Sequence, residues 1–250
     1  MSNLEHDNDA GLANFIAGWS KRLKESEVLA AGFAVMGLTN FGERPVPSLR
    51  LAEVLGRSVS EAESLAQGHS TPGAPVTCGS ADGLGLLRVE DGRITFNPAR
   101  ARSAARRHLQ IGDRRFGMIG CAPDVFLYAP LVRPSLRLEE TCPVTGTPIR
   151  LVFTPGRVES VDPGGAVVPI LPPQEFDQLE GMLDRDPEAD MCAESPFYST
   201  AEAAQGWLAA HPGGRVFPVR EAWDLSFHRE WRDRMSALLN FDLERLRNAG

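Results

Sequence analysis

Apolar residues at helical spacing dominate the first forty positions of the chain. They recur at intervals of three and four over residues 12–23, and a second apolar run extends over residues 28–38. This pattern is typical of helices that bury one face. We therefore predict a helix, a break and a second helix over residues 12–38.

Two short helices and a hairpin are predicted next. Gly56 is placed to end a first helix, and Ser58 with Glu61 has the spacing of a capping box that opens the second. Further on, Asp91-Gly92 separates two short β-type runs, as in a tight type I′ hairpin. Helices followed by such a hairpin predict a winged-helix-like domain over residues 10–97.

The next segment combines arginines with helix signals. Asn97-Pro98 reads as an N-cap followed by proline at the first helical position. Seven arginines lie between Arg93 and Arg115. We expect an arginine-rich connecting helix over residues 98–115.

The pattern changes again in the second half of the chain. Short β-rich runs separated by glycine and proline turns fill residues 135–170, and they predict a mostly antiparallel sheet. Residues 175–190 are acidic and show no strong period, as in a loop or loose helix. A strand at 215–219 and a long amphipathic helix from Ser226 complete the pattern. The fold class predicted is α+β, with a mixed second domain over residues 116–250 in which helices flank antiparallel strands.

Charge and hydropathy limit the partners. With 26 basic and 33 acidic residues, the net charge is -7, which argues against nucleic acid or an anionic membrane as the main partner. The sequence has no apolar run of the ~20 residues that a membrane helix needs, and its first ten residues are polar and acidic. We expect a cytoplasmic protein without membrane attachment.

The four cysteines, at positions 78, 121, 142 and 192, form no CxxC pair. This spacing disfavours zinc ribbons and thioredoxin-like centres. In a reducing cytosol these thiols stay free, so each is a small buried hydrophobe or a reactive group.

Cys121 is the best candidate for chemistry. Pro123 favours the first turn of a short helix, which places Cys121 at its N-terminus, where the helix dipole favours a thiolate. Arg114 and Arg115 can add to this effect if they fold toward the sulfur. Asp124 lies within about one turn, so its carboxyl can exchange a proton with the thiol. Spacing alone favours a simpler alternative, a buried cysteine beside a first-turn carboxylate.

Three segments make the sequence recognisable: GCAPDVFLYAPL from residue 120, TCPVTGTPIRLVFTPGRVESVDPGGAVVPILP from residue 141, and MCAESPFYSTAEAAQGWLAAHP from residue 191. In order and spacing they resemble the bacterial organomercurial (alkylmercury) lyases over most of residues 116–235. The resemblance implies a catalytic domain at 116–250, the catalytic set Cys121, Asp124 and Cys192, and a non-catalytic role for Cys142. It also agrees with a helical N-terminal domain of winged-helix type.

The implied reaction suits these residue types. Mercury(II) is a soft cation that prefers thiolates, and a second thiolate weakens its bond to carbon. Cys121 or Cys192 attacks mercury, Asp124 relays the thiol proton to carbon, and a hydrocarbon leaves. Hg(II) stays on the two sulfurs beside Asp124 as product, and no organic cofactor is needed. The implied partners are an organomercurial substrate, cellular thiols and a mercuric reductase, in a mercury-resistance role.

The alternative function is a mercury- or soft-metal-responsive DNA-binding regulator, or a metal-binding protein that has lost lyase activity. The winged-helix-like segment and the arginine run favour it, whereas Glu61 and Glu63 on the would-be recognition helix would repel phosphates. Salt-sensitive binding to duplex DNA distinguishes the two functions.

The remaining candidates carry less weight. Cys78 lies in a glycine- and proline-rich stretch and is assigned no role, and none of the five histidines has a second ligand at metal spacing. Three aromatic residues flank Cys121 and are candidates for the pocket wall, with core packing as the default; they are Phe116, Phe126 and Tyr128. Three tryptophans are expected in the core, Trp207, Trp223 and Trp231.

Overall fold

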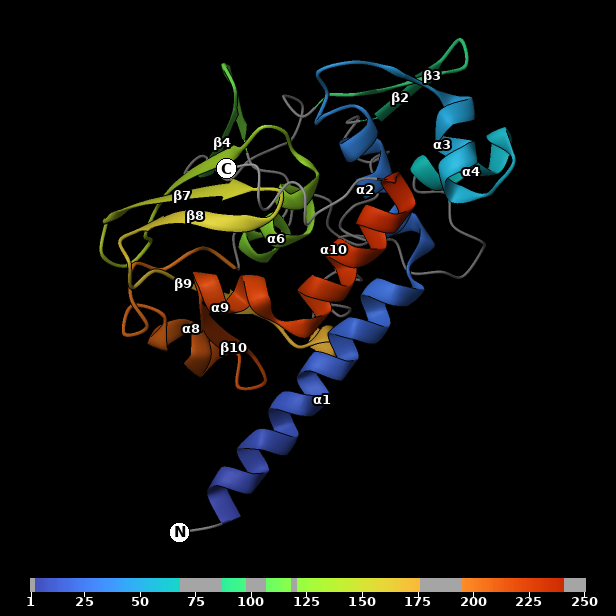
Figure 1. Ribbon diagram of the computed structural model, residues 1–250. Helices are drawn as coiled ribbons and strands as arrows, with labels where there is room; N and C mark the ends of the chain where they lie inside the picture. Colours follow the sequence, from blue (N-terminus) through green and yellow to red (C-terminus); the bar gives the residue numbers. More distant parts are fainter. Residues whose placement is uncertain (1–2, 68–86, 98–106, 118–120, 176–194, 241–250) are drawn as a thin grey trace.

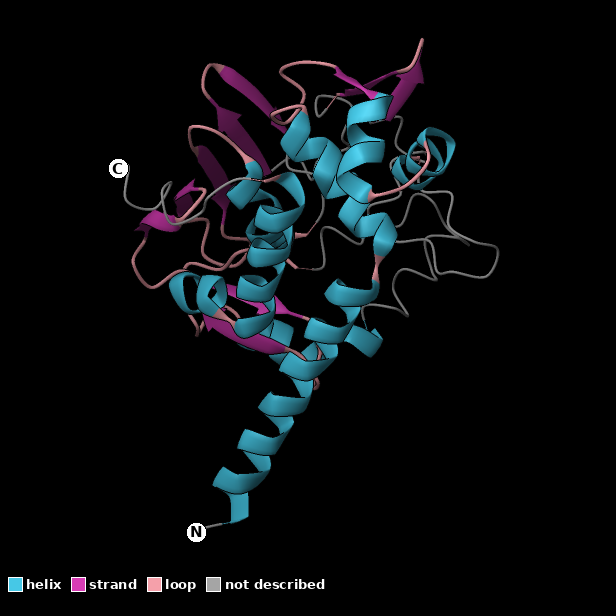
Figure 2. Cartoon of the chain, turned by 45° about the vertical axis from the view of Figure 1, so that its right-hand side comes forward, coloured by secondary structure: helices cyan, strands magenta, loops and turns pink. Residues whose placement is uncertain are grey.

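The computed structural model describes residues 3–67, 87–97, 107–117, 121–175 and 195–240. Within these ranges the fold combines helices with antiparallel sheets (Figures 1 and 2). The α+β class predicted from the sequence is therefore confirmed.

Two helices begin the chain, α1 (Asn3–Glu25) and α2 (Glu27–Leu38). Between them, Ser26 caps α2, because its side chain accepts a hydrogen bond from the backbone N–H of Leu29 at 3.2 Å. The predicted helix, break and helix are confirmed. The N-terminal part of α1 projects away from the body of the molecule (Figure 1).

Short helices and a small sheet follow. The capping box of Ser58 and Glu61 is present, Gly56 ends the preceding helix with φ 63°, and the Asp91-Gly92 turn has positive φ at both residues, as a type I′ hairpin requires. These local predictions are confirmed. The elements are β1 (Val46–Pro47), α3 (Ser48–Leu55), α4 (Val59–Ala66), β2 (Leu87–Glu90) and β3 (Arg93–Phe96), with sheet order β1-β3-β2.

A five-stranded antiparallel sheet forms the second half of the fold, with strand order β5-β4-β6-β7-β8. The predicted run of strands beyond residue 135 is confirmed. The strands are β4 (Arg107–Ile111), β5 (Arg114–Gly117), β6 (Leu136–Thr141), β7 (Pro148–Thr154) and β8 (Arg157–Asp162).

The prediction of an arginine-rich helix over residues 98–115 is wrong where the structure describes it. Residues 107–117 form the hairpin β4–β5, which turns at Gly112 with φ 57°. Leu109 and Ile111 alternate with exposed Gln110 and lie buried in the sheet. Pairing with β6 supplies backbone partners that outweigh local helix propensity. Residues 98–106 lie outside the described ranges.

A two-stranded sheet and several helices complete the fold. The strand predicted near residue 215 is present and pairs with residues 167–170. The elements are α6 (Val125–Tyr128), β9 (Val167–Ile170), α8 (Gln205–Ala210), β10 (Arg215–Pro218), α9 (Val219–Asp224) and α10 (Ser226–Leu239).

Helix α10 joins the two halves of the fold. It packs along α1 and also contacts α2, α3, α6 and α9 (Figures 1 and 2). On its inner face, Trp231 is 1% exposed, donates its indole N–H to the carbonyl of Leu127 at 3.0 Å, and meets Phe33 edge to face. The core is therefore continuous from the first helices to the sheet. The three tryptophans expected in the core, Trp207, Trp223 and Trp231, are all buried.

Candidate active site

Cys121 lies directly before a turn of 3₁₀ helix, Ala122–Asp124, that continues into α6. It is 5% exposed and has extended backbone angles, with Pro123 in the first turn after it. The predicted position of Cys121 at the start of a short helix is confirmed.

Asp124 folds back onto this cysteine. Its Oδ2 accepts a hydrogen bond from the backbone N–H of Cys121 at 2.6 Å, and its own N–H donates to the Cys121 carbonyl at 3.0 Å. A charge-assisted bond of this length fixes the carboxylate firmly. The proximity of Asp124 to Cys121 predicted from their spacing is confirmed.

The segment after residue 194 is fastened beside this turn. Ala122 donates its N–H to the carbonyl of Ser195 at 3.0 Å. Two residues on, the Phe197 N–H donates to Oε2 of Glu140 at 3.2 Å, and Glu140 in turn pairs with Arg107, with both charged side chains buried. The described chain therefore resumes in contact with the Cys121 turn.

Several predicted positions lie outside the described residues. Cys192, the third member of the implied catalytic set, is one of them, and Cys78 is another. The acidic stretch expected at 175–190 also lies outside them apart from Glu175.

Cys121 and Asp124 border a small pocket of about 30 Å³. This volume holds one or two water molecules. Helix α1, the Cys121 turn, the end of β9 and helix α10 supply its walls. The apolar lining consists of Trp19, Leu23, Pro123, Leu127, Ile170, Leu171 and Phe227, and the other lining residues are Cys121, Asp124, Ser195 and His228.

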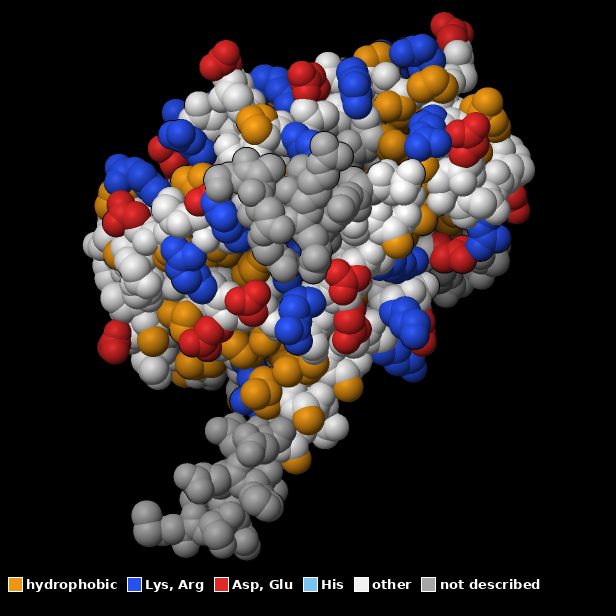
Figure 3. Space-filling view, viewed as in Figure 1, with side chains coloured by type: hydrophobic (Ala, Val, Ile, Leu, Met, Phe, Trp, Pro, Cys, Tyr) orange, Lys and Arg blue, Asp and Glu red, His pale blue; other side chains and the backbone are white. Residues whose placement is uncertain are grey.

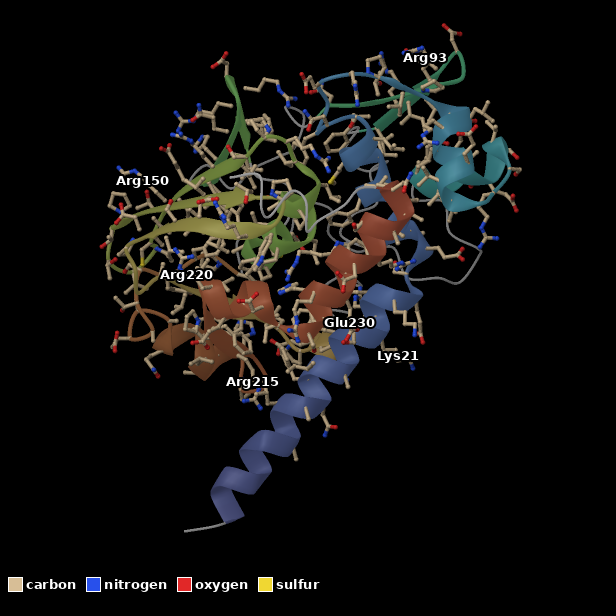
Figure 4. The ribbon with its side chains drawn as sticks, viewed as in Figure 1. Lys21, Arg93, Arg150, Arg215, Arg220 and Glu230 are labelled. Atoms are coloured by element: carbon tan, nitrogen blue, oxygen red, sulfur yellow. The ribbon has the colours of Figure 1, made fainter. Side chains whose placement is uncertain are left out.

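Helix α1 forms one wall of this pocket. The Trp19 indole N–H donates to the carbonyl of Leu171 at 2.8 Å, and its ring stacks on Phe227 with centroids 6.1 Å apart. Leu23 and Phe227 also line a larger groove of about 510 Å³ between α1 and α10. Glu230 on α10 and Lys21 on α1 lie where these helices cross (Figure 4). Helical spacing predicts Trp19 as a core residue but cannot show that it lines the same pocket as Cys121.

His228 is the pocket residue that sequence reasoning missed. It is 2% exposed, and its Nδ1 bonds the carbonyl of Ala222 at 2.6 Å. Burial lowers the pKa of His228 to about 3; the Ala222 carbonyl opposes this shift and the nearby positive charge of Arg232 adds to it. The imidazole is therefore neutral near pH 7. No spacing within the sequence relates it to Cys121.

The arginines expected to assist Cys121 are bound elsewhere. Arg114 donates to the carbonyls of Phe41 at 2.9 Å and Asn40 at 3.2 Å, and Arg115 pairs with Glu139 at 3.1 Å. The condition for a contribution of Arg114 and Arg115, that they fold toward the Cys121 sulfur, is therefore not met.

These contacts also weaken the case for a DNA-binding regulator. The described arginines between Arg93 and Arg115 form hydrogen bonds or ion pairs with other groups of the protein, such as the Pro45 carbonyl and the Glu140 carboxylate. Acidic and basic side chains are interspersed over the face that Figure 3 shows. The described surface therefore offers no continuous basic patch on this face for a polyanion.

The three aromatic residues proposed for the pocket wall belong to the core instead. Phe116 stacks on Phe41 at 5.3 Å, Tyr128 packs against the same ring, and Phe126 meets Phe153 edge to face. None of the three lines the pocket. The default expectation of core packing is the one confirmed.

Cys142 occupies a separate environment. It is 1% exposed and lies at the turn after β6, where its carbonyl accepts the N–H of Gly146 at 3.0 Å. Burial raises its pKa, but hydrogen bonds from Thr145 and Ser199 outweigh burial and lower the pKa to about 7. Cys142 does not line the pocket, in agreement with the non-catalytic role implied for it.

The described residues contain no helix long and apolar enough to cross a membrane. They also contain no group of three or more His, Cys, Asp or Glu side chains arranged to hold a metal ion.

Known relatives place these features in one family. Residues 104–231 match the family model described as MerB, alkylmercury lyase. Alkylmercury lyase of Bacillus cereus is 36% identical over 105 residues, which cover 42% of this chain and 44% of that protein. Alkylmercury lyase of Streptomyces lividans is 29% identical over 136 residues, covering 54% of this chain and 59% of that protein. The aligned region thus spans about half the length of these relatives.

A solved structure shares the fold. The crystal structure of the mercury-bound form of MerB2 superposes with a TM-score of 0.53 over 90% of this chain and 100% of that chain, at 16% identity. At this identity the likeness concerns the fold alone. The family match covers just over half of the chain and includes Cys121, Asp124 and Cys192. The chain belongs to the alkylmercury lyase family.

Proposed function

We propose that the protein is an organomercurial lyase that cleaves a carbon–mercury bond by protonolysis and yields a hydrocarbon and Hg(II). The observation that carries the proposal is the position of Asp124, whose carboxylate is fixed 2.6 Å from the Cys121 N–H at the edge of a mostly apolar pocket. A soft nucleophile and a proton carrier thus share one small enclosure.

The proposed reaction uses two thiols and one carboxylate. The sulfur of Cys121 or Cys192 bonds to mercury and gives its proton to Asp124. The second sulfur then bonds to the metal, the carbon–mercury bond breaks with its electron pair on carbon, and Asp124 protonates that carbon. The remaining thiol proton goes to the thiolate that carried the substrate in solution. Hg(II) ends on two sulfurs, and no organic cofactor takes part.

The pocket walls favour the proton transfer. Apolar side chains from α1, β9 and α10 limit the water beside Cys121 and Asp124. Removal of water strengthens the electrostatic interactions inside the pocket and favours a neutral carboxyl at the moment when a proton is needed.

The chain length supports a role for Cys192. Cys192 lies three positions before Ser195, which contacts the Cys121 turn, and an extended chain spans at most ~3.6 Å per residue. The Cα of Cys192 therefore lies within ~11 Å of the Ser195 Cα. We assign it the second mercury thiolate, together with Cys121, while Asp124 remains beside the metal.

Other parts of the chain have proposed roles around this centre. The unit of α3, α4 and the β2–β3 hairpin is proposed to be winged-helix-like within a domain at 10–97, and residues 116–250 form the proposed catalytic domain. Cellular thiols or a mercuric reductase would remove the Hg(II) product in a cytoplasmic mercury-resistance pathway.

The test follows hydrocarbon release. Purified protein is incubated with methylmercury or phenylmercury and excess thiol, and methane or benzene is measured by gas chromatography. We expect turnover in the wild type and in Cys142→Ser, and a loss of at least ~100-fold in Cys121→Ser, Cys192→Ser and Asp124→Asn.

The asparagine variant separates catalysis from folding. Its amide oxygen can still accept the Cys121 N–H, but the side chain cannot carry the proton. A wild type that binds both mercurials and releases no hydrocarbon would overturn the proposed function.

A further inference from the structure

His228 brings an unprotonated ring nitrogen to the pocket. A carbonyl oxygen only accepts hydrogen bonds, so the 2.6 Å contact with Ala222 requires the proton of the ring to lie on Nδ1. Nε2 is then the unprotonated nitrogen, and its lone pair can accept a hydrogen bond or bind a metal ion. The ring lines the pocket, and the side chain is only 2% exposed.

The surroundings keep this nitrogen in the form that binds metals. Burial and the charge of Arg232 disfavour protonation of the ring. Its faces pack against Phe126 and Phe227, with centroids 5.0 Å and 4.3 Å away, which fixes the ring plane. An imidazole held by a hydrogen bond from Nδ1–H to a carbonyl is the usual arrangement of a metal-ligating histidine.

Cys121 and His228 border the same pocket. They line one space of about 30 Å³, Cys121 from the turn before α6 and His228 from α10. A space of this size holds one or two water molecules, so a single ion there would lie among these lining residues. His228 therefore adds a nitrogen donor to the pocket that contains Cys121.

We infer that Nε2 of His228 is a further ligand of the Hg(II) product, added to the thiolate coordination. The inference rests on the proposed function for its biological role, but it concerns the metal that remains after the carbon–mercury bond is broken. The ring donates a lone pair and loses no proton on binding. Its effect is to hold the toxic product until an external thiol removes it.

The first experiment uses the unmodified protein with one equivalent of mercuric chloride and no organic substrate. Histidines are labelled with the heavy nitrogen isotope, and the Nε2 signal of His228 is assigned by its loss in His228→Asn. We expect this signal alone among the five histidines to shift on loading. An unmoved Nε2 signal in fully loaded protein overturns the inference, whatever the variants do.

The second experiment measures product release. The amide N–H of asparagine can replace the bond from Nδ1–H to Ala222 while the Nε2 lone pair is removed, so His228→Asn tests the ligand more than the packing. Transfer of Hg(II) from loaded protein to excess dithiol should be about tenfold faster in His228→Asn. The matched control is His108→Asn in β4, outside the pocket, which should release Hg(II) at the wild-type rate. Equal rates in His228→Asn and wild type would also overturn the inference.

These outcomes are independent of lyase activity. If the wild type releases no hydrocarbon but its Nε2 signal shifts, the proposed function is refuted and His228 is still a ligand of Hg(II). If the wild type turns over fully but its Nε2 signal does not move, the proposed function stands and His228 is not a ligand.

Discussion

At the scale of single residues, Cys121 and Cys142 show how neighbours divide the roles of identical side chains. Cys121 borders the pocket beside a carboxylate, whereas Cys142 lies under a turn where two hydroxyl side chains hydrogen-bond its sulfur. Hydroxyl donors stabilise a thiolate without offering it a substrate. Reactivity therefore depends on access, and thiolate character alone does not confer it.

This difference predicts a pH dependence of stability. The folded pKa of Cys142 is about 7, below its usual value of 9.0, so the folded state binds the thiol proton less tightly than the unfolded state. The resulting stabilisation is fully present above pH 9, and it is lost as the pH falls through 7. Urea unfolding should show about 2 kcal/mol more stability at pH 9 than at pH 6 in wild type relative to Cys142→Ser. Equal pH dependence of stability in the two proteins would contradict the conclusion that hydrogen bonds from Thr145 and Ser199 lower the pKa of Cys142.

The candidate site was predictable only where its parts are close in sequence. Cys121 and Asp124 share one turn, so their spacing and Pro123 were sufficient to bring sulfur and carboxylate together. His228 reaches the same pocket from a helix more than one hundred positions later. Only tertiary packing brings such residues together, and neither hydrophobic periodicity nor motif spacing predicts that packing.

At the scale of elements, β4 shows why local patterns can mislead. Its apolar alternation covers only five residues and follows an arginine- and alanine-rich run with a helix-start signal. Arg107 falls within the predicted arginine-rich helix, yet it is 1% exposed and pairs across the sheet with Glu140. A buried charge is held by its partner, and that partner lies in another strand.

Helix α1 leads to a prediction about substrate size. Trp19 fills one side of a pocket of about 30 Å³, where a methyl group, about as large as a water molecule, fits better than a phenyl ring. In a working lyase, Trp19→Leu should raise the ratio of phenylmercury to methylmercury turnover about tenfold. It should also lower the free energy of unfolding by a few kcal/mol, because ring contacts and the bond to Leu171 are lost.

The matched control is Trp207→Leu in α8. Trp207 is buried but lies outside the pocket lining, so its loss should cost stability without changing the substrate ratio. Parallel gas-chromatographic assays of the two variants give this ratio directly. An unchanged ratio in Trp19→Leu would show that α1 does not limit the organic group.

At the scale of the whole molecule, the helical half and the sheet half share one core. Trp231 touches Phe33 of the early helices and donates to the Leu127 carbonyl beside the active-site turn, and Arg234 donates to the carbonyl of Leu23 in α1. Loss of order in either half would therefore expose apolar surface in the other. The pocket depends on both halves, because α1 and α10 supply its walls.

This shared core predicts one cooperative unfolding transition. Far-ultraviolet circular dichroism and tryptophan fluorescence should give coincident urea curves, because no unit within the described residues keeps a complete core without α10. Trp231→Ala removes a fully buried ring and its hydrogen bond, so it should lower the free energy of unfolding by about 3–5 kcal/mol and shift both curves together. A separate transition for the N-terminal helices, unaffected by Trp231→Ala, would contradict this prediction. It would mean that residues 10–97 fold independently and that an independent domain supplies one wall of the active-site pocket.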